Sequence, residues 1–192
     1  YVCGSSVGSI SNLPQTELCR EKGYEMLYLT DEIDEFAMQT LMSFDDKQFK
    51  SIDAEDAELQ SDEEKEQTKK EMEENSELLS FIKEALGDKV SEVVISNKLK
   101  SHPVCLSAKG PVTLEMEKYF AQMPGSETKP KAERVLELNS AHKAFNALKS
   151  AYETDKEQAK KYAQILYSQA ALIAGFNIDN TVEYCDMVCD LM

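Results

Sequence analysis

Hydrophobic residues change their spacing abruptly within the segment from Gly23 to Leu41. Up to Thr30 they form a short continuous run, Met26–Leu29, which predicts a strand buried on both faces. After Thr30 they recur at helical spacing, and acidic residues occupy the first turn, where a helix N-terminus favours negative charge. The apolar positions of this predicted helix are Ile33, Phe36, Ala37, Thr40 and Leu41. The pattern predicts a strand, a cap and a helix that buries Ile33, Ala37 and Leu41 and turns Phe36 outward.

The residues around this segment complete a small α/β unit. We expect a first strand at Tyr1–Cys3, a helix pair between Ser5 and Lys22, and a short extended piece at Phe49–Ile52. One or two strands cannot close a sheet by themselves. Because the chain also starts without a methionine, in a strand-like stretch, we expect it to be the C-terminal part of a longer protein.

A long charged stretch follows the α/β unit. The stretch Ala54–Asn75 is rich in Glu, Lys and Gln, which favour helix, so it predicts a helix that runs into the next apolar residues. These apolar residues are Leu78, Leu79, Ile82 and Leu86. Gly87 lies where a left-handed cap would end the helix. The helix would therefore join two domains through an ordered element.

From Val90 onward the hydrophobic period returns to two and predicts three strands of one small sheet. The strands are centred on Val93–Ile95, Val104–Leu106 and Val135–Leu138. The predicted helices are Pro111–Met123, between the second and third strands, and then Ala141–Ala151, Asp155–Ala174 and Asn180–Met192. The fold class is therefore α+β: the end of an α/β domain, a charged helix, a small three-stranded sheet with helices, and a helical hairpin.

The last two helices carry apolar stripes at three/four spacing. The first stripe is Tyr162, Ile165, Leu166, Gln169, Leu172, Ile173 and Phe176, and the second is Thr181, Val182, Cys185, Val188, Cys189 and Met192. Gly175 and Asp179 supply a stop and a restart, so the helices should fold back antiparallel. A lone hairpin would leave part of these stripes in water. Either symmetric self-association covers them, as a four-helix bundle from two chains, or the hairpin packs on its own sheet.

The helix Pro111–Met123 carries a second stripe, made of methionine and aromatic residues. Its members are Val112, Met116, Tyr119, Phe120 and Met123. Such a stripe is more often core than binding surface. However, methionine suits a surface that accepts varied apolar partners, and this short helix lies between Gly110 and a polar loop. A partly exposed, mobile helix is therefore a reasonable hypothesis.

Composition narrows the classes of function. The 192 residues are 42% hydrophobic, enough for a real core, and the formal charge of −15 argues against nucleic-acid binding, which depends on Lys and Arg. The segment Asp53–Glu77 holds 12 acidic and 3 basic residues, typical of a solvated helix face and less often of a site for a basic partner. No apolar run approaches the roughly 20 residues that span a bilayer. Five scattered cysteines favour a reducing cytoplasm.

Candidate catalytic and metal-binding patterns are weak. No glycine-rich phosphate loop or nucleotide fingerprint occurs. His102 and Cys105 are the elements of a cysteine hydrolase, but Pro103 separates them and Cys105 falls on a predicted buried strand. Cys185 and Cys189 lie one helical turn apart, yet zinc needs two further ligands, so we interpret them as small buried hydrophobic residues. We predict no metal or cofactor in this chain.

The segment from Gly23 to Leu41 resembles the late middle domain of the heat shock protein 90 family, where a strand runs into an L-[ST]-D-x-[IV]-D-E-[FWY] helix. The resemblance continues in order over essentially the whole chain. It includes Phe44, Asp45, Lys47, Phe49–Ile52, Phe81–Leu86, Gly87 and Leu136–Asn139. Two departures are Phe36, where bacterial members commonly have tryptophan, and the spacing of Pro124–Lys131.

The resemblance implies a chaperone, with residues 1–65 as the end of the middle domain and linker helix and residues 66–192 as the C-terminal dimerisation domain. It implies homodimer contacts by Ile165, Leu166, Gln169, Leu172, Ile173, Val182, Cys185, Val188, Cys189 and Met192. It implies contact with unfolded client proteins by Phe36, Gln39, Met116, Tyr119 and Phe120. In the family, ATP and Mg²⁺ bind outside the part that this chain resembles, so we expect no ATP hydrolysis here.

Two other classes of function stay open on the residues alone. One is a non-enzymatic scaffold or adaptor that binds through the acidic helix, and the other is a cysteine hydrolase. The family resemblance also implies a cytoplasmic bacterial protein with no membrane or nucleic-acid partner.

Overall fold

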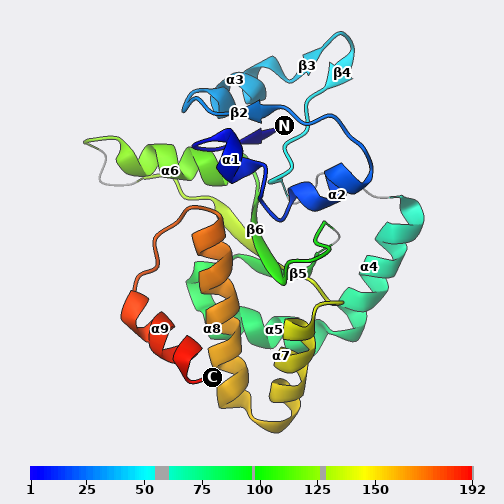
Figure 1. The fold of residues 1–192 in the computed structure, drawn as a ribbon, viewed down its shortest axis with the longest axis vertical. Coiled ribbons are helices and arrows are strands. Elements are labelled where there is room, and N and C mark those ends of the chain that lie inside the picture. The colour runs from blue at the N-terminus through cyan, green and yellow to red at the C-terminus, as the bar shows by residue number, and fades with distance from the viewer. Residues whose placement is uncertain (55–60, 97, 126–128, 192) are drawn as a thin grey trace.

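The computed structural model describes residues 1–54, 61–96, 98–125 and 129–191. Figure 1 shows one group of short elements, α1 to α3 and β1 to β4, and a second group built from a sheet and longer helices. Helix α6 lies between the two groups, beside α3 and near the end of α8. The mixed α and β content agrees with the predicted fold class. Among the described residues, no helix combines the length and apolar character needed to cross a membrane.

The first group contains two small sheets. Its elements are β1 (Val2–Cys3), α1 (Val7–Ile10), α2 (Thr16–Glu21), β2 (Tyr28–Leu29), α3 (Asp34–Leu41), β3 (Ser43–Phe44) and β4 (Lys47–Gln48). Strands β1 and β2 are parallel, and β3 and β4 form an antiparallel hairpin. A small core of Val2, Ile10, Cys19 and Ile52 packs beneath them. The predicted first strand and helix pair are confirmed.

The prediction of a strand buried on both faces before α3 is wrong. Only Tyr28 and Leu29 pair in β2, both are half-buried, and Leu27 is 42% exposed. The sheet has two strands, β1 and β2, so it offers β2 a single neighbour and little cover.

The prediction that α3 buries Ile33, Ala37 and Leu41 is also wrong. Ile33 and Leu41 are 61% and 52% exposed, and Ala37 is exposed as well. The buried residues are Glu35 and Met38. Glu35 tolerates burial because its carboxylate accepts hydrogen bonds from Tyr1 Oη at 3.3 Å and Gln39 Nε2 at 3.4 Å.

The charged stretch forms two helices instead of one. They are α4 (Asp62–Glu74) and α5 (Ser76–Leu86). Ser61 and Glu64 form a capping box at the start of α4, and residues 55–60 lie outside the described part of the chain. The break falls at Asn75, whose side chain donates to Glu71 O at 2.7 Å and so competes with the helical backbone. Gly87 ends α5 as predicted, but with φ +59° and ψ −129° it does not adopt the predicted left-handed helical conformation.

The second group is built on the predicted three-stranded sheet, which is confirmed. Its elements are a 3₁₀ turn (Gly87–Lys89), β5 (Glu92–Ile95), β6 (Val104–Lys109), α6 (Leu114–Gln122), β7 (Glu133–Leu138), α7 (Lys143–Thr154), α8 (Lys156–Ile173) and α9 (Thr181–Cys189). Strand β7 is central, parallel to β5 and antiparallel to β6. Helices α5, α7 and α8 pack against this sheet, and the main core that they share with it includes Ile82, Leu106, Leu136, Leu138 and Leu148.

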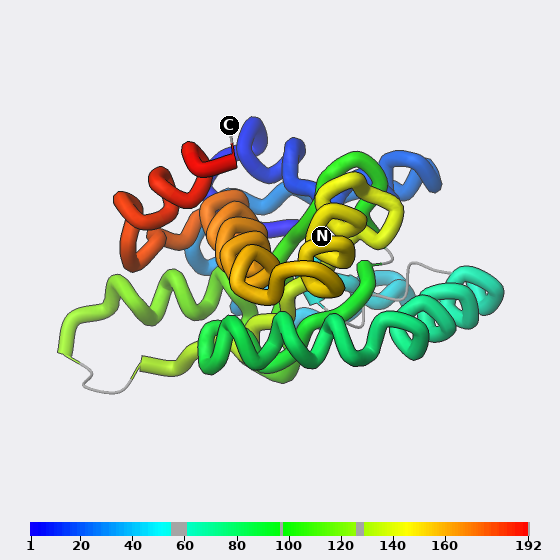
Figure 2. Tube along the Cα trace, turned by 90° about the horizontal axis from the view of Figure 1, so that it is seen from below, coloured from blue at the N-terminus to red at the C-terminus, as the bar shows by residue number. Residues whose placement is uncertain are grey.

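Caps define the ends of the helices near the C-terminus. Asp155, predicted as the first residue of the helix, is its N-cap and accepts hydrogen bonds from two backbone N–H groups of α8. At the other end of α8, Gly175 N–H bonds Leu172 O and Phe176 N–H bonds Ala171 O, which is the Schellman pattern. Asn180, and not Asp179, caps α9. Figure 2 shows α9 folded beside α8, with α4 extending on the opposite side of the molecule.

Buried polar contacts join the two groups. Lys98 is fully buried, and its Nζ lies 3.2 Å from Glu137 Oε1, 2.5 Å from Ala54 O and 3.4 Å from Ile52 O. The Nε2 atom of Gln15 donates to Leu106 O at 3.0 Å. The Lys98 bonds hold the segment that leaves the first group, and the Gln15 bond joins the connection between α1 and α2 to the sheet of the second group.

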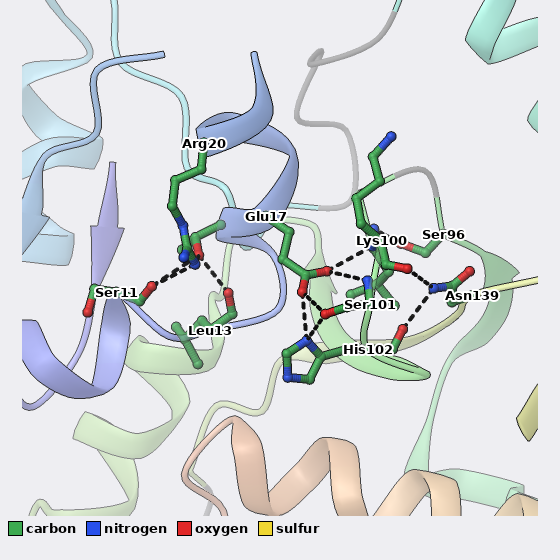
Figure 3. Close-up of polar contacts among 11 residues, drawn as sticks. Ser11, Leu13, Glu17, Arg20, Ser96, Lys100, Ser101, His102 and Asn139 are labelled. Atoms are coloured by element: carbon green, nitrogen blue, oxygen red, sulfur yellow. Dashed lines mark hydrogen bonds and ion pairs between the residues drawn. The ribbon is translucent and has the colours of Figure 1, made fainter. Parts of the chain in front are cut away.

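A second junction centres on Glu17 of α2 (Figure 3). Its carboxylate accepts hydrogen bonds from Lys100 N at 2.8 Å, Ser101 N at 3.0 Å and Ser101 Oγ, and His102 Nδ1 lies 2.8 Å away. Although partial burial opposes it, these hydrogen bonds lower the pKa of Glu17 to about 2. The folded state therefore favours the ionised form of Glu17.

Replacing Glu17 by glutamine should destabilise the fold by about 1 to 3 kcal/mol at neutral pH, because a charged acceptor of several bonds is lost. The native pKa is depressed, so its stabilisation is present above about pH 4.5 and is lost as the pH falls toward 2. Urea unfolding at pH 7 and pH 3 should therefore show a smaller difference between wild type and Glu17→Gln at pH 3. A difference that grows at pH 3 would contradict this account.

Candidate functional site

Three aromatic side chains meet where α3 crosses α6. The ring of Phe36 lies 5.1 Å from that of Tyr119 and 5.8 Å from that of Phe120, measured between centroids. The rings of Tyr119 and Phe120 are 6.0 Å apart. All three pairs are edge-to-face, the favoured arrangement for aromatic rings. We call Phe36, Tyr119 and Phe120 the aromatic cluster, and all three are half-buried.

The structure thus brings together three of the five residues predicted to contact clients, from elements far apart in the sequence. Met116, on α6, is also half-buried, and Gln39, on α3, is exposed. The prediction that Phe36 faces outward needs correction, because the ring rests on α6 and keeps only part of its surface in water. The periodicity of α3 alone could not reveal the neighbour that covers it.

Further exposed apolar residues lie on α3, on the segment after it, and at the end of α6. They are Ile33, Leu41, Met42, Phe44 and Met123, between 45% and 70% exposed. None of them was predicted as a contact residue. Phe44 ends β3, directly before a two-residue turn in which Asp45 and Asp46 have φ +49° and +61°. Two acidic residues in sequence were the available signal for this hairpin.

Helix α6 is held by its cap and by a buried ion pair. Thr113 caps the helix, so Pro111 precedes it and does not start it, contrary to prediction. Leu114 and Glu117 are its buried residues. Arg134 of β7 binds the Glu117 carboxylate at 2.7 Å and 3.2 Å. Burial of Glu117 is tolerated because the charge is paired.

A small cavity of about 110 Å³ lies between α6, the first group and the end of α8, and the buried residue Asp53 lines it. Burial raises the pKa of the Asp53 carboxyl to about 7, and the Glu115 and Glu35 carboxylates add to the rise. Lys98 and Lys118 act in the opposite direction. Asp53 therefore changes charge near neutral pH.

Replacing Asp53 by asparagine should stabilise the fold at pH 8 by about 2 to 4 kcal/mol. The native pKa lies above the ordinary value of 3.8, so wild-type stability should decline as the pH rises from about 4 through 7. Urea unfolding at pH 5 and pH 8 measures this, and the decline should be smaller in Asp53→Asn. Equal slopes in the two proteins would show that Asp53 is not the responsible group.

The hairpin of α8 and α9 presents a second apolar surface. Val182 is 69% exposed, Leu172 46% and Ile173 37%, and Cys185 and Cys189 are exposed. Val182, Cys185 and Cys189 share one face of α9 by their spacing. We call these five residues the hairpin surface. No described residue of α9 is buried, so this helix is covered on one side only.

Other residues of the predicted dimer contact lie elsewhere. Ile165 and Leu166 are 5% and 7% exposed within the chain, so neither offers much surface to a second chain. Gln169 and Val188 are half-buried, and Met192 lies outside the described residues. The interpretation of Cys185 and Cys189 as buried is wrong. Their stripe looked inward-facing in sequence, but Tyr184 and Met187 occupy the side of α9 toward the chain.

The cysteine hydrolase hypothesis is not supported by this geometry. Cys105 is fully buried, and burial raises the pKa of its thiol well above the ordinary value. His102 is bonded to Glu17 instead. Within the described ranges, no group of three or more His, Cys, Asp or Glu side chains could hold a metal ion.

Comparison with known proteins gives a consistent result. The model of the family described as "Hsp90 protein" matches residues 1–192. Over all 192 residues the chain is 47% identical to the chaperone protein HtpG of Clostridium acetobutylicum, 45% to that of Clostridium perfringens and 46% to that of Bacillus subtilis. The chain spans 30% of the length of each of these relatives.

Proposed function

Because the chain belongs to the Hsp90 protein family, we propose that it holds two chaperone subunits together through α8 and α9 and binds client proteins beside α3 and α6. The relatives with at least 45% identity are chaperone proteins, and the chain is a portion of that kind of protein. The observation that carries the client-binding proposal is the aromatic cluster itself. Phe36 and Tyr119 were predicted as contacts on separate elements, and their rings lie 5.1 Å apart.

The aromatic cluster suits an unfolded protein. Its rings keep partly exposed faces, and Met116 supplies an adaptable apolar side chain on the same helix. Met42, Phe44 and Met123 are also exposed, on the segments that follow α3 and α6. Large exposed apolar patches typically mark sites of protein interaction. A client segment would bind by apolar burial, with no requirement for one sequence.

The hairpin surface suits a symmetric contact between two copies. In a twofold contact the same patch serves both subunits, and two hairpins would form a four-helix bundle. Val182, Cys185 and Cys189 would be covered by the partner hairpin. We propose that ATP and Mg²⁺ bind in parts of the whole protein that this chain does not span, and that the protein acts in the cytoplasm.

Serine substitutions at Phe36, Tyr119 and Phe120 test the client-binding proposal. The triple variant should need about tenfold more protein to suppress aggregation of thermally unfolded citrate synthase, because the apolar contacts of the cluster are lost. Light scattering follows the aggregation. A matched control is the double variant Phe81→Ser and Tyr152→Ser, since these half-buried rings pair 5.0 Å apart on α5 and α7.

If the folded triple variant suppressed aggregation as well as the wild type, the aromatic cluster would not be part of the client site.

A different experiment tests the hypothesis of an acidic adaptor. Helix α4 has no buried residue and lies on the side opposite α9. Lysine substitutions at Glu63 and Glu66 should leave client binding unchanged under our proposal and should abolish binding of a basic partner under the adaptor hypothesis.

A further inference from the structure

We propose that Arg134 is a positioning residue that couples the client-binding helix α6 to the turn between α8 and α9, so that client binding and dimerisation strengthen each other. This inference rests on the proposed function. It goes further by assigning a route between the two surfaces and a sign to their coupling.

Arg134 contacts α6, α8 and the α8–α9 turn at once. Its guanidinium donates to Glu117 of α6 through Nη2 at 2.7 Å and Nε at 3.2 Å, a bidentate pair. Its Nη1 donates to Tyr167 Oη of α8 at 3.1 Å. Its Cζ lies 4.0 Å from the ring centroid of Phe176, in the turn itself. One side chain therefore fixes three elements relative to one another.

Lys118 makes a second connection between the same elements. From α6 its Nζ donates to Ala174 O, the C-cap of α8, at 3.0 Å, and it lies 5.7 Å from the ring centroid of Phe176. Gly175 has φ +81°, and a Cβ atom there would lie 3.4 Å from Lys118 Nζ. The turn that reverses the chain toward α9 is thus packed directly against α6.

The ion pair between Glu117 and Arg134 is largely shielded from solvent. Glu117 is 8% exposed, and its Oε2 also accepts from Ala132 N at 3.2 Å. Although burial of the guanidinium opposes it, Glu117 and Tyr167 hold the pKa of Arg134 above its ordinary value. If Glu117 of α6 moved away from Arg134, a buried charge would be left uncompensated. Because Arg134 also contacts Phe176 in the turn, we expect α6 and the turn to shift together and not separately.

A cavity separates Arg134 and its partners from α9. Glu117, Arg134 and Tyr167 line a cavity of about 980 Å³ whose other wall includes Tyr184 and Met187 of α9. Helix α9 is therefore positioned mainly by the turn at Phe176 and by its packing on α8. A displacement of the turn would change the direction in which α9 presents Val182, Cys185 and Cys189.

Coupling follows from these contacts. A client that packs on Tyr119 and Phe120 selects the docked position of α6, and this position places Glu117 and Lys118 where they hold the turn. A partner chain on α9 selects the same arrangement from the other side. Two ligands that favour one conformation each increase the affinity for the other by the same factor.

The test is the dimer dissociation constant of the full chain, measured by sedimentation equilibrium with and without saturating reduced, carboxymethylated lactalbumin as the unfolded client. Wild type should dimerise at least about fivefold more tightly with the client present. Phe176→Leu keeps the apolar volume but removes the ring face, and Arg134→Gln removes the charge. Both should reduce the effect to less than about twofold, while Phe176→Tyr, which keeps the ring, should retain it.

Tyr152→Leu is the matched control, because it removes a ring of α7 that lies 4.6 Å from Lys156 Nζ, at the end of α8 opposite to the turn. It should leave the client effect intact. A wild-type chain that dimerises and binds the client without any change in dimer affinity overturns the coupling alone. A wild-type chain that does not dimerise or does not bind the client overturns the proposed function as well. Full coupling in folded Phe176→Leu and Arg134→Gln would overturn the assigned route.

Discussion

Val182→Asp is expected to convert the dimer into a monomer at micromolar concentration. Val182 is 69% exposed in the single chain and lies at the start of α9, on the face that carries Cys185 and Cys189. Burying an aspartate from each subunit against its symmetry mate would place two unpaired negative charges in one contact. We expect the dissociation constant to rise by more than about 100-fold, which analytical ultracentrifugation measures.

Val7→Asp is the matched control for this substitution. Val7 is 53% exposed on α1, in the other group of elements, so the same change of chemistry should leave the dimer intact. A Val182→Asp protein that remains folded and dimerises like wild type would show that the contact lies elsewhere on the chain.

Lys98→Ala is expected to cost about 3 to 5 kcal/mol of stability. The Lys98 side chain is 1% exposed and its partner Glu137 is 3% exposed. Removing the ammonium leaves a buried carboxylate without its cation and the carbonyl groups of Ile52 and Ala54 without their donor. Because these carbonyls belong to the segment that leaves the first group, the loss should also loosen the junction. Urea unfolding measures the change.

Two comparisons separate the buried pair from an ordinary surface charge. Lys160→Ala breaks an exposed pair with Glu157 and should change stability by less than about 1 kcal/mol. Lys98→Met combined with Glu137→Gln removes both charges and should recover a large part of the loss. If Lys98→Ala were as mild as Lys160→Ala, the junction would not depend on this ion pair.

Local patterns predicted the second group of elements well. Alternating apolar residues gave β5, β6 and β7, and three/four spacing gave α5 and α8. Gly87 and Gly175 ended their helices as expected, because their positive φ values need a residue without a Cβ atom. These features depend on residues that are close in sequence, so they can be read from sequence.

The errors arose where a distant partner decides the outcome. Glu35 and Glu117 are acidic, yet they are buried because Tyr1 and Arg134 on other elements bind them. Ile33 and Leu41 looked like core residues and are exposed, because α3 packs through Glu35 and Met38. Helical periodicity identifies a stripe but not the element that covers it.

The candidate site also depends on contacts between distant elements that the sequence pattern does not identify. The sequence and its family resemblance predicted Phe36, Tyr119 and Phe120 as contact residues, and the fold adds that their rings touch. Of the residues predicted for the dimer contact, Ile165 and Leu166 are buried within the chain, and the contact itself stays a prediction. The link through Arg134 had no sequence signal, because its partners Glu117, Tyr167 and Phe176 lie on separate elements.

The central claim is that α8 and α9 form a self-complementary surface that holds two copies together. Sedimentation equilibrium of the unaltered chain at about 10 μM tests it most directly. We predict a molar mass of twice the 21.6 kDa of one chain, which falls to the monomer value in Val182→Asp. A mass of 21.6 kDa for the unaltered, folded chain would contradict the account.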